Sequence, residues 1–146
     1  MKQNCTGTTV VELVVVLLCG AVLLTIAVPG FDRLRDEWTL WGAAHLIRSS
    51  LQWGRMHAIA SNGSLTFNID PGGKGFSWAD SETGERFEES VRIIPGAVRI
   101  TSAPNKPLRF YPKGNAAPSG TYVVQGNAGR YRVVVAITGR IRLQRF

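Results

Sequence analysis

The sequence predicts an α+β protein in which a long N-terminal α-helix packs on a C-terminal antiparallel β-sheet domain. Two observations carry this prediction. Residues 13–31 contain no charged side chain, and apolar residues recur at helical spacing beyond them. From residue 64 onward the apolar residues alternate with polar ones, in short runs separated by turns rich in Gly, Pro and Asn. The first pattern is typical of a helix and the second of β-strands.

The apolar run is long enough to cross a membrane. Its nineteen residues would form a helix of about 28 Å, close to a hydrocarbon core of about 30 Å. A cleaved secretory signal, a plain anchor and an anchor behind a short leader are the three alternatives. Glu12 interrupts the start of the run, and an ionisable group at that depth is rare and generally paired. Cleavage after Gly7 would place the new amine of Thr8 four residues from Glu12 and supply such a partner.

The helix should continue beyond the membrane segment to residue 62. Residues at steps of three and four form one apolar face: Leu40, Ala43, Ala44, Ile47, Leu51, Gly54 and Ala58. Pro29-Gly30 should bend this helix without ending it, because proline removes one backbone hydrogen bond. Asn62-Gly63 is a helix stop signal. We therefore expect one helix from the leader junction to residue 62.

Three tryptophans on this helix admit two interpretations. They could form a platform on which nucleic-acid bases stack. We expect instead that Trp38 and Trp41 lie near the membrane exit, where tryptophan is enriched, and that Trp53 fills the core between helix and sheet.

The second half of the chain should fold into short antiparallel strands. The predicted strands are SLTFNID, FSWA, SVRII, AVRIT, LRFYPKG, TYVVQG and RYRVVVAIT, with PGGKG, DSETGE and NAAPSG as turns or loops. TYVVQG and RYRVVVAIT flank NAG and should form a hairpin. Strands of this kind pack on the C-terminal half of the helix.

Charge is unevenly distributed along the chain. The net charge is +7, yet residues 1–89 carry seven Lys/Arg against ten Asp/Glu, whereas residues 90–146 carry ten Lys/Arg and no acid. Such an asymmetry indicates contact with an anion such as nucleic acid or lipid headgroups. A solvated basic surface, or charge that protects an edge strand from aggregation, explains it equally well.

The C-terminal arginines have a spacing that suits phosphate contact. Arg130 and Arg132 should share one face of a strand, since side chains two residues apart point the same way. Arg140 and Arg142 would share that face if the strand continued, but Gly139 allows a bend there. Arg145 follows near the end. Guanidinium groups are always charged and present several fixed donors, which favours phosphate binding.

No residue pattern in the sequence indicates an enzyme. Ser, His and Asp occur in no catalytic arrangement, and PGGKG lacks the spacing of a phosphate-binding loop. His45 and His57 are too far apart to form a helical ligand pair. We therefore expect neither a metal nor another cofactor.

The stretch G-T-T-V-V-E-L, residues 7–13, resembles the leader junction of type IV pilins and of type II secretion pseudopilins. The resemblance implies cleavage after Gly7 by a prepilin peptidase, methylation of Thr8, and a role in fibre assembly for Glu12, which pairs with the N-terminus of a neighbouring subunit. Pro29 lies at a position where many pilins have a helix-kinking proline. Thr8 departs from the usual phenylalanine, which affects the methylation expectation most.

The helical stretch LIRSSLQWGRMHAIASNG, the strands after it and the final GRIR resemble the FimT/GspH branch of that family. The similarity implies a leader (1–7), a membrane and assembly helix (8–31) and a globular pilin domain (32–146), in which 32–62 form an amphipathic helix and 64–146 the strands. It implies an inner-membrane protein with its domain in the periplasm. The expected partners are other pilins, prepilin peptidase, the inner-membrane assembly platform, and membrane lipid around residues 8–31.

Two functions follow from this resemblance, and the sequence leaves both open. In FimT-like minor pilins a Gly-Arg-x-Arg motif, here Gly139, Arg140 and Arg142, contacts double-stranded DNA during uptake. Arg130, Arg132 and Arg145 would extend that contact. In GspH-like pseudopilins the subunit has a purely structural role in protein secretion, and the same short motif occurs there.

Overall fold

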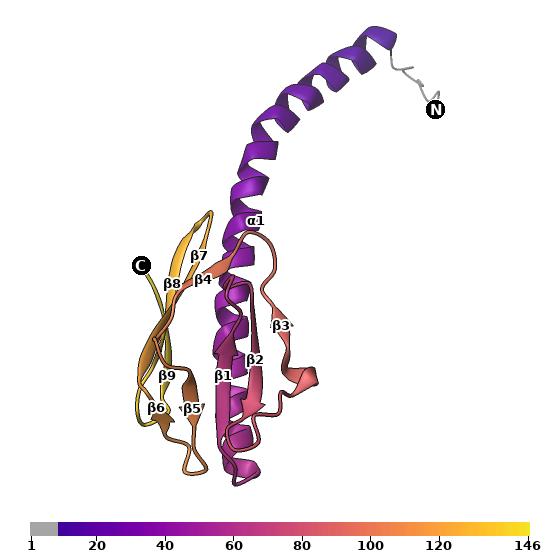
Figure 1. Ribbon diagram of the computed structural model, residues 1–146. Helices are drawn as coiled ribbons and strands as arrows, with labels where there is room; N and C mark the ends of the chain where they lie inside the picture. Colours follow the sequence, from indigo (N-terminus) through magenta and orange to yellow (C-terminus); the bar gives the residue numbers. More distant parts are fainter. Residues whose placement is uncertain (1–8) are drawn as a thin grey trace, which may run out of the picture. The chain divides into compact units, whose positions relative to one another are not determined.

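The computed structural model describes residues 9–146, apart from the side chains of residues 26–29. The chain divides into two compact units, Met1–Arg35 and Asp36–Phe146. One α-helix, α1 (Val10–Ala60), contributes to both units and continues through Pro29 and Gly30, as the sequence predicts. The confirmed fold class is a long N-terminal helix packed on antiparallel β-structure (Figure 1).

In the first unit α1 is an apolar helix with a polar cap. The backbone N–H of Glu12 donates to the Thr9 side-chain oxygen at 3.3 Å, so Thr9 caps the helix start. An 18-residue window of α1 has a mean hydropathy of 2.8, and none of it is buried within the protein. The helix is thus long and apolar enough to cross a membrane. Gly7 and Thr8 lie outside the described residues.

In the second unit α1 buries the apolar face that its spacing predicts. The face comprises Leu40, Ala43, Ala44, Ile47, Leu51, Gly54 and Ala58, all buried. The helix ends at the predicted stop, where Asn62 has a φ of 51°. The Gly63 N–H donates to the Ala58 carbonyl at 3.2 Å and the Asn62 N–H to the Ile59 carbonyl at 3.4 Å. These two bonds form a Schellman motif, which satisfies the last helical carbonyls.

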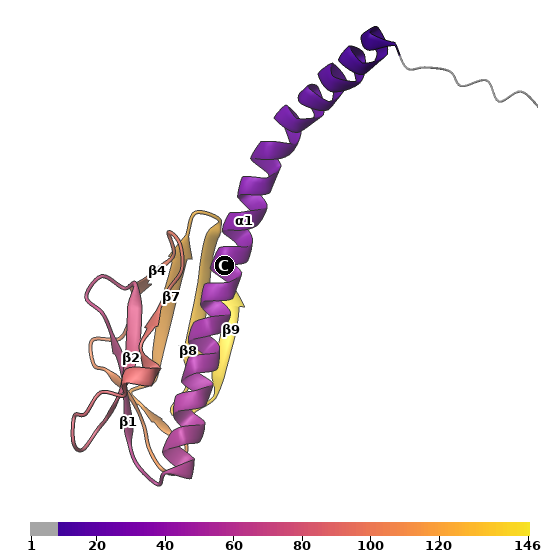
Figure 2. The same ribbon diagram turned by 90° about the vertical axis from the view of Figure 1, so that its right-hand side faces the viewer.

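Nine strands form two antiparallel sheets in this unit, where the sequence suggested a single set of strands. One sheet has the order β3-β2-β1-β5-β6 and the other β4-β7-β8-β9. Their bounds are β1 (Leu65–Ile69), β2 (Gly75–Asp80), β3 (Arg92–Ile93), β4 (Arg99–Ser102), β5 (Leu108–Phe110), β6 (Ala116–Ala117), β7 (Gly120–Gly126), β8 (Gly129–Val135) and β9 (Ile141–Arg145). In Figures 1 and 2 both sheets lie alongside the C-terminal half of α1.

Two short elements differ from the sequence prediction. The NAAPSG segment contains strand β6 (Ala116–Ala117), which pairs with β5 and was expected to be loop. A 3-10 turn, η1 (Glu88–Ser90), precedes β3. Both are too short for a recognisable period, so their formation depends on neighbouring strands. The predicted hairpin of β7 and β8 is confirmed by pairing from Gly120↔Val135 to Gly126↔Gly129.

The core between α1 and the sheets is filled by Trp78 where the sequence analysis expected Trp53. Trp78 is fully buried, whereas Trp53 is 46% exposed. Trp78 fits because Gly54 has no side chain: a β-carbon there would lie 2.7 Å from the Trp78 ring atom Cζ3 and closer still to two others. The indole nitrogen of Trp78 donates to Ser50 Oγ at 3.0 Å. The Trp53 prediction was wrong because the backbone at Gly54 is the contact surface for the β2 indole.

Candidate nucleic-acid interface

The C-terminal arginines lie on two paired strands, not on one continuous strand. The chain reverses direction after β8, with Gly139 at a φ of 77°. The Gly139 N–H donates to the Ala136 carbonyl at 2.8 Å, and the Ala136 N–H donates to the Arg140 carbonyl at 2.9 Å. β9 then pairs antiparallel with β8. The bend that Gly139 allowed is therefore a full turn, which places the Gly-Arg-x-Arg motif at the start of β9.

Pairing brings arginines from both strands to one face of the sheet. Arg132 is opposite Gln144, and Arg142 is opposite Val134. Directly opposed residues of an antiparallel pair share a face, and the alternating neighbours Val133 and Val135 are buried towards α1. Arg130, Arg132 and Arg142 consequently point away from the core. Arg140, two residues before Arg142, is exposed and has the same parity.

A fifth arginine, Arg99, joins this face from a distant strand. Arg99 in β4 is opposite Gln125 in β7, and Gln125 is opposite Arg130 in β8. All three residues therefore stand in one row across the sheet. Sequence analysis missed Arg99, although its place between buried Val98 and Ile100 predicts an outward side chain. We call Arg99, Arg130, Arg132, Arg140 and Arg142 the arginine face.

Arg145 lies on the other side of the sheet from the arginine face. It is opposite Tyr131 in the β8–β9 register, and its guanidinium carbon lies 6.0 Å from the centre of that ring. Its Nη2 forms an ion pair with Glu37 Oε1 of α1 at 3.2 Å. Arg145 is thus placed towards α1, whereas the other four predicted arginines face outward.

The outward surface of the β4-β7-β8-β9 sheet is strongly basic. Among the described residues its other members are Ser102, Thr121, Val123, Gln125, Val134, Gln144 and Phe146, and none of them is acidic. The guanidinium carbon of Arg132 lies 4.4 Å from the centre of the Phe146 ring, a cation–π contact that holds the arginine over the sheet. With strands about 4.8 Å apart and residues about 3.3 Å apart along each strand, the arginines are spread over this surface instead of being gathered at one point.

The predicted assembly residue, Glu12, lies in the first unit. Glu12 is in the first turn of α1 and its side chain is exposed. Its position three residues after Thr9 is also that of the acid in a capping box, and the macrodipole favours a carboxylate there. A local reason for Glu12 therefore exists beside the predicted role in assembly.

The arrangement of helix and sheets identifies the fold. A long helix, apolar at its start, that packs its later half on antiparallel sheets is the pilin fold. The search of solved structures finds the type IV minor pilin FimU of Pseudomonas aeruginosa PAO1 at a TM-score of 0.61 and 21% identity, covering 75% of this chain and 90% of that one. It also finds the minor pseudopilin EpsH from the type 2 secretion system of Vibrio cholerae at a TM-score of 0.57 and 15% identity, covering 70% and 93%.

A family assignment comes from the sequence itself. The family described as "Type II transport protein GspH" matches residues 43–139. The chain belongs to this family and is a minor pilin or pseudopilin, a structural subunit that assembles with other pilins. The comparison with curated proteins finds no match.

Proposed function

We propose that this protein is a minor pilin of a type IV pilus that binds double-stranded DNA through the arginine face. Prepilin peptidase cleaves after Gly7 and methylates Thr8. Residues 8–31 hold the subunit in the inner membrane with its domain in the periplasm. The assembly platform then inserts it into the fibre, where Glu12 pairs with the N-terminus of a neighbouring subunit.

The arginine face is the observation that carries the DNA-binding proposal. Its arginines come from three strands and share one surface on which the described residues include no acid. Arginine is charged at every physiological pH and donates to phosphate oxygens in pairs. Sequence-independent binding needs little beyond such an array.

Binding of a labelled DNA duplex to the full chain in nonionic detergent tests this proposal. Four or five phosphate contacts predict that log K falls with log salt at a slope of about −3.6 to −4.5. Arg140→Ala with Arg142→Ala should reduce that slope by about 2. The control replaces two exposed arginines outside the face, Arg86→Ala with Arg109→Ala, and should leave the slope nearly unchanged. No detectable binding at low salt would refute DNA binding and leave the pilin assignment intact.

Mass spectrometry of protein recovered from membranes tests the processing step. The expected N-terminus is methylated Thr8, and Gly7→Val should retain the leader, because a bulky residue blocks the cleavage site. Full-length wild-type protein that begins at Met1 in a cell with active prepilin peptidase would contradict the processing proposal.

A second function is favoured by the family match. The family that matches residues 43–139 is described as "Type II transport protein GspH". The second function is therefore that of a structural pseudopilin in a type II secretion system. Cross-linking in cells separates the two functions. Capture of type IV pilus subunits supports the first, and capture of secretion pseudopilins together with a secretion defect on deletion supports the second.

A further inference from the structure

One side chain of α1, Arg55, connects the helix to the turn that precedes Arg140. Arg55 Nε donates to the Gly114 carbonyl oxygen at 2.9 Å. Gly139 lies against the same group: a β-carbon at Gly139 would overlap the Gly114 oxygen and would lie 2.7 Å from Arg55 Nε. Three segments distant in the sequence therefore meet at Arg55. They are the last third of α1, the loop between β5 and β6, and the β8–β9 turn.

The two glycines leave the space that the Arg55 side chain occupies. Gly114 has a φ of 78° and Gly139 a φ of 77°, conformations that L-residues rarely adopt. A β-carbon at Gly114 would lie 2.9 Å from Ile59 Cδ1 and 3.3 Å from Arg55 Nε. Because neither glycine has a side chain, the Arg55 side chain can approach both backbones. The glycine of the Gly-Arg-x-Arg motif thus has a packing role.

The turn has little freedom once Arg55 is in place. The Gly139 N–H is bonded to the Ala136 carbonyl, and the Ala116 N–H donates to the Ile137 carbonyl at 2.8 Å. The first bond closes the turn and the second ties it to β6. The turn also packs against Gly114, whose carbonyl oxygen accepts the hydrogen bond from Arg55 of α1. Arg140 follows the clamped glycine directly, and Arg142 follows two residues later. A displaced turn would move both guanidinium groups relative to Arg130 and Arg132.

We infer that Arg55 is a positioning residue of the arginine face, holding Arg140 and Arg142 in register for phosphate contact without touching the ligand. This inference rests on the proposed DNA binding. Arg55 is part-buried on α1, which packs on the core side of the sheet with Val133 and Val135, whereas the arginine face points the opposite way. Its contribution to binding passes through Gly139.

A double-mutant cycle in the full chain in detergent separates positioning from direct contact. The measurements are duplex affinity and salt slope for the wild type, Arg55→Ala, Arg140→Ala with Arg142→Ala, and the triple variant. At 0.1 M salt one lost phosphate contact weakens binding about eightfold, and Arg55→Ala should weaken it by about that factor. In the triple variant Arg55→Ala should add nothing, because its targets are gone. An undiminished effect of Arg55→Ala in the triple variant would overturn the inference.

Two controls separate the clamp from general charge. Arg48→Ala removes a charge from the same helix, two turns earlier, and should change affinity much less than Arg55→Ala. Arg55→Lys keeps the charge but lacks the guanidinium Nε–H, so it should bind about as weakly as Arg55→Ala. Equal losses in Arg48→Ala and Arg55→Ala, or full affinity in Arg55→Lys, would show that charge alone matters and would overturn the inference.

Amide hydrogen exchange tests the clamp without DNA. Arg55→Ala and Arg55→Lys should accelerate exchange at Gly139 and Ala116 while core amides such as Val133 keep their wild-type protection. Unchanged exchange at the turn overturns the inference whether or not DNA binds. If the wild type binds no duplex, the proposed DNA binding is wrong, and Arg55 then positions no phosphate site. Accelerated exchange in the Arg55 variants would show in that case that the contact between Arg55 and the turn exists all the same.

Discussion

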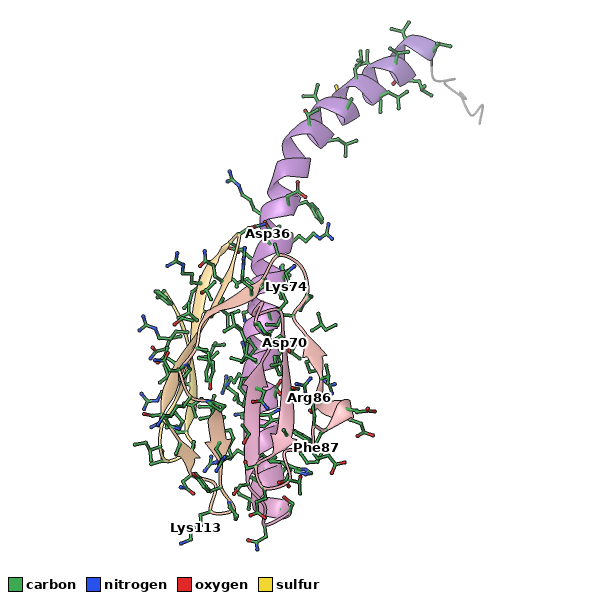
Figure 3. The ribbon with its side chains drawn as sticks, viewed as in Figure 1. Asp36, Asp70, Lys74, Arg86, Phe87 and Lys113 are labelled. Atoms are coloured by element: carbon green, nitrogen blue, oxygen red, sulfur yellow. The ribbon has the colours of Figure 1, made fainter. Side chains whose placement is uncertain are left out.

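Arg145 and Glu37 join the end of the last strand to α1 through an ion pair of 3.2 Å between Nη2 and Oε1. The other end of β9 begins at the turn that Arg55 holds through Gly114. The two contacts are at opposite ends of the domain, as Asp36, next to Glu37, and Lys113, next to Gly114, show in Figure 3. β9 therefore contacts α1 directly at its C-terminal end through Arg145. At its start the turn packs against Gly114, the residue that Arg55 bonds from α1.

The position of Arg145 predicts that it differs from Arg142 in function. Arg145→Ala should leave duplex affinity within about twofold, whereas Arg142→Ala should weaken it about eightfold at 0.1 M salt through one lost phosphate contact. Both partners of the Arg145 ion pair are more than half exposed, so Arg145→Ala should cost roughly 0–1 kcal/mol of unfolding free energy. Titration of a labelled duplex and chemical denaturation measure the two effects. Equal binding losses in the two variants would contradict the face assignment.

Arg99 should contribute to DNA binding although it lies far from the C-terminal motif in sequence. Arg99→Ala should reduce the salt slope by about 0.9, the value for one phosphate contact. Arg109→Ala is the matched control, because Arg109 is an exposed arginine on a strand of the other sheet. A slope that stays at the wild-type value in Arg99→Ala would confine the interface to β8 and β9.

Gly54 should be the most sensitive helical glycine. Gly54→Ala forces a methyl group into the Trp78 ring, and overpacking of this kind typically costs about 1–3 kcal/mol. Gly42 is the control, because a β-carbon there meets nothing within 4 Å, and Gly42→Ala should stabilise the helix by roughly 0.5–1 kcal/mol. Denaturant unfolding followed by Trp fluorescence measures both. Similar stabilities for the two variants would contradict the Gly54–Trp78 contact.

Glu12 should matter for fibre assembly more than for folding. Glu12→Ala should leave leader cleavage largely intact but reduce incorporation into fibres, since it removes the proposed partner of the new amine. Asp32→Ala, which removes another exposed acid of the same helix, should assemble normally. Immunoblots of membrane and sheared-fibre fractions measure the effect. Normal assembly of Glu12→Ala would leave only the helix-capping role.

The Asp80 carboxylate should make a pH-dependent contribution to the stability of the folded protein. Its Oδ1 accepts hydrogen bonds from the backbone N–H groups of Glu82 at 2.7 Å and Thr83 at 3.1 Å, and these bonds lower the pKa of Asp80. Because the pKa is lower in the folded state, the stabilisation is present above the unfolded value of about 3.9 and is lost as the pH falls through the folded value. The Tm difference between Asp80→Ala and the wild type should therefore be smaller at pH 2 than at pH 7. A Tm difference of the same size at both pH values would contradict this linkage.

The sequence specified what depends on local order along the chain. The spacing of Leu40, Ile47 and Leu51 determined which helix face is buried, because a helix repeats every 3.6 residues whatever it packs against. Asn62-Gly63 determined the helix end through backbone conformation. The difference in net charge between residues 1–89 and 90–146 can also be read from the sequence alone. Period-two patterns determined most strands, and the NAG turn determined the β7–β8 hairpin, but the other strand partners were not specified locally.

The tertiary structure decided what depends on pairing between distant segments. Arg99 joins Arg130 only because β4 pairs with β7 as well as β7 with β8, and no local pattern encodes the pairing of β4 with β7. Arg145 faces α1 and Arg142 faces solvent because the turn at Gly139 sets the β9 register, and one residue of shift exchanges the two faces of a strand. Trp78, and not Trp53, fills the core because the space above Gly54 lies between α1 and β2. The packing of a core depends on both surfaces in contact, and the helix sequence describes only one of them.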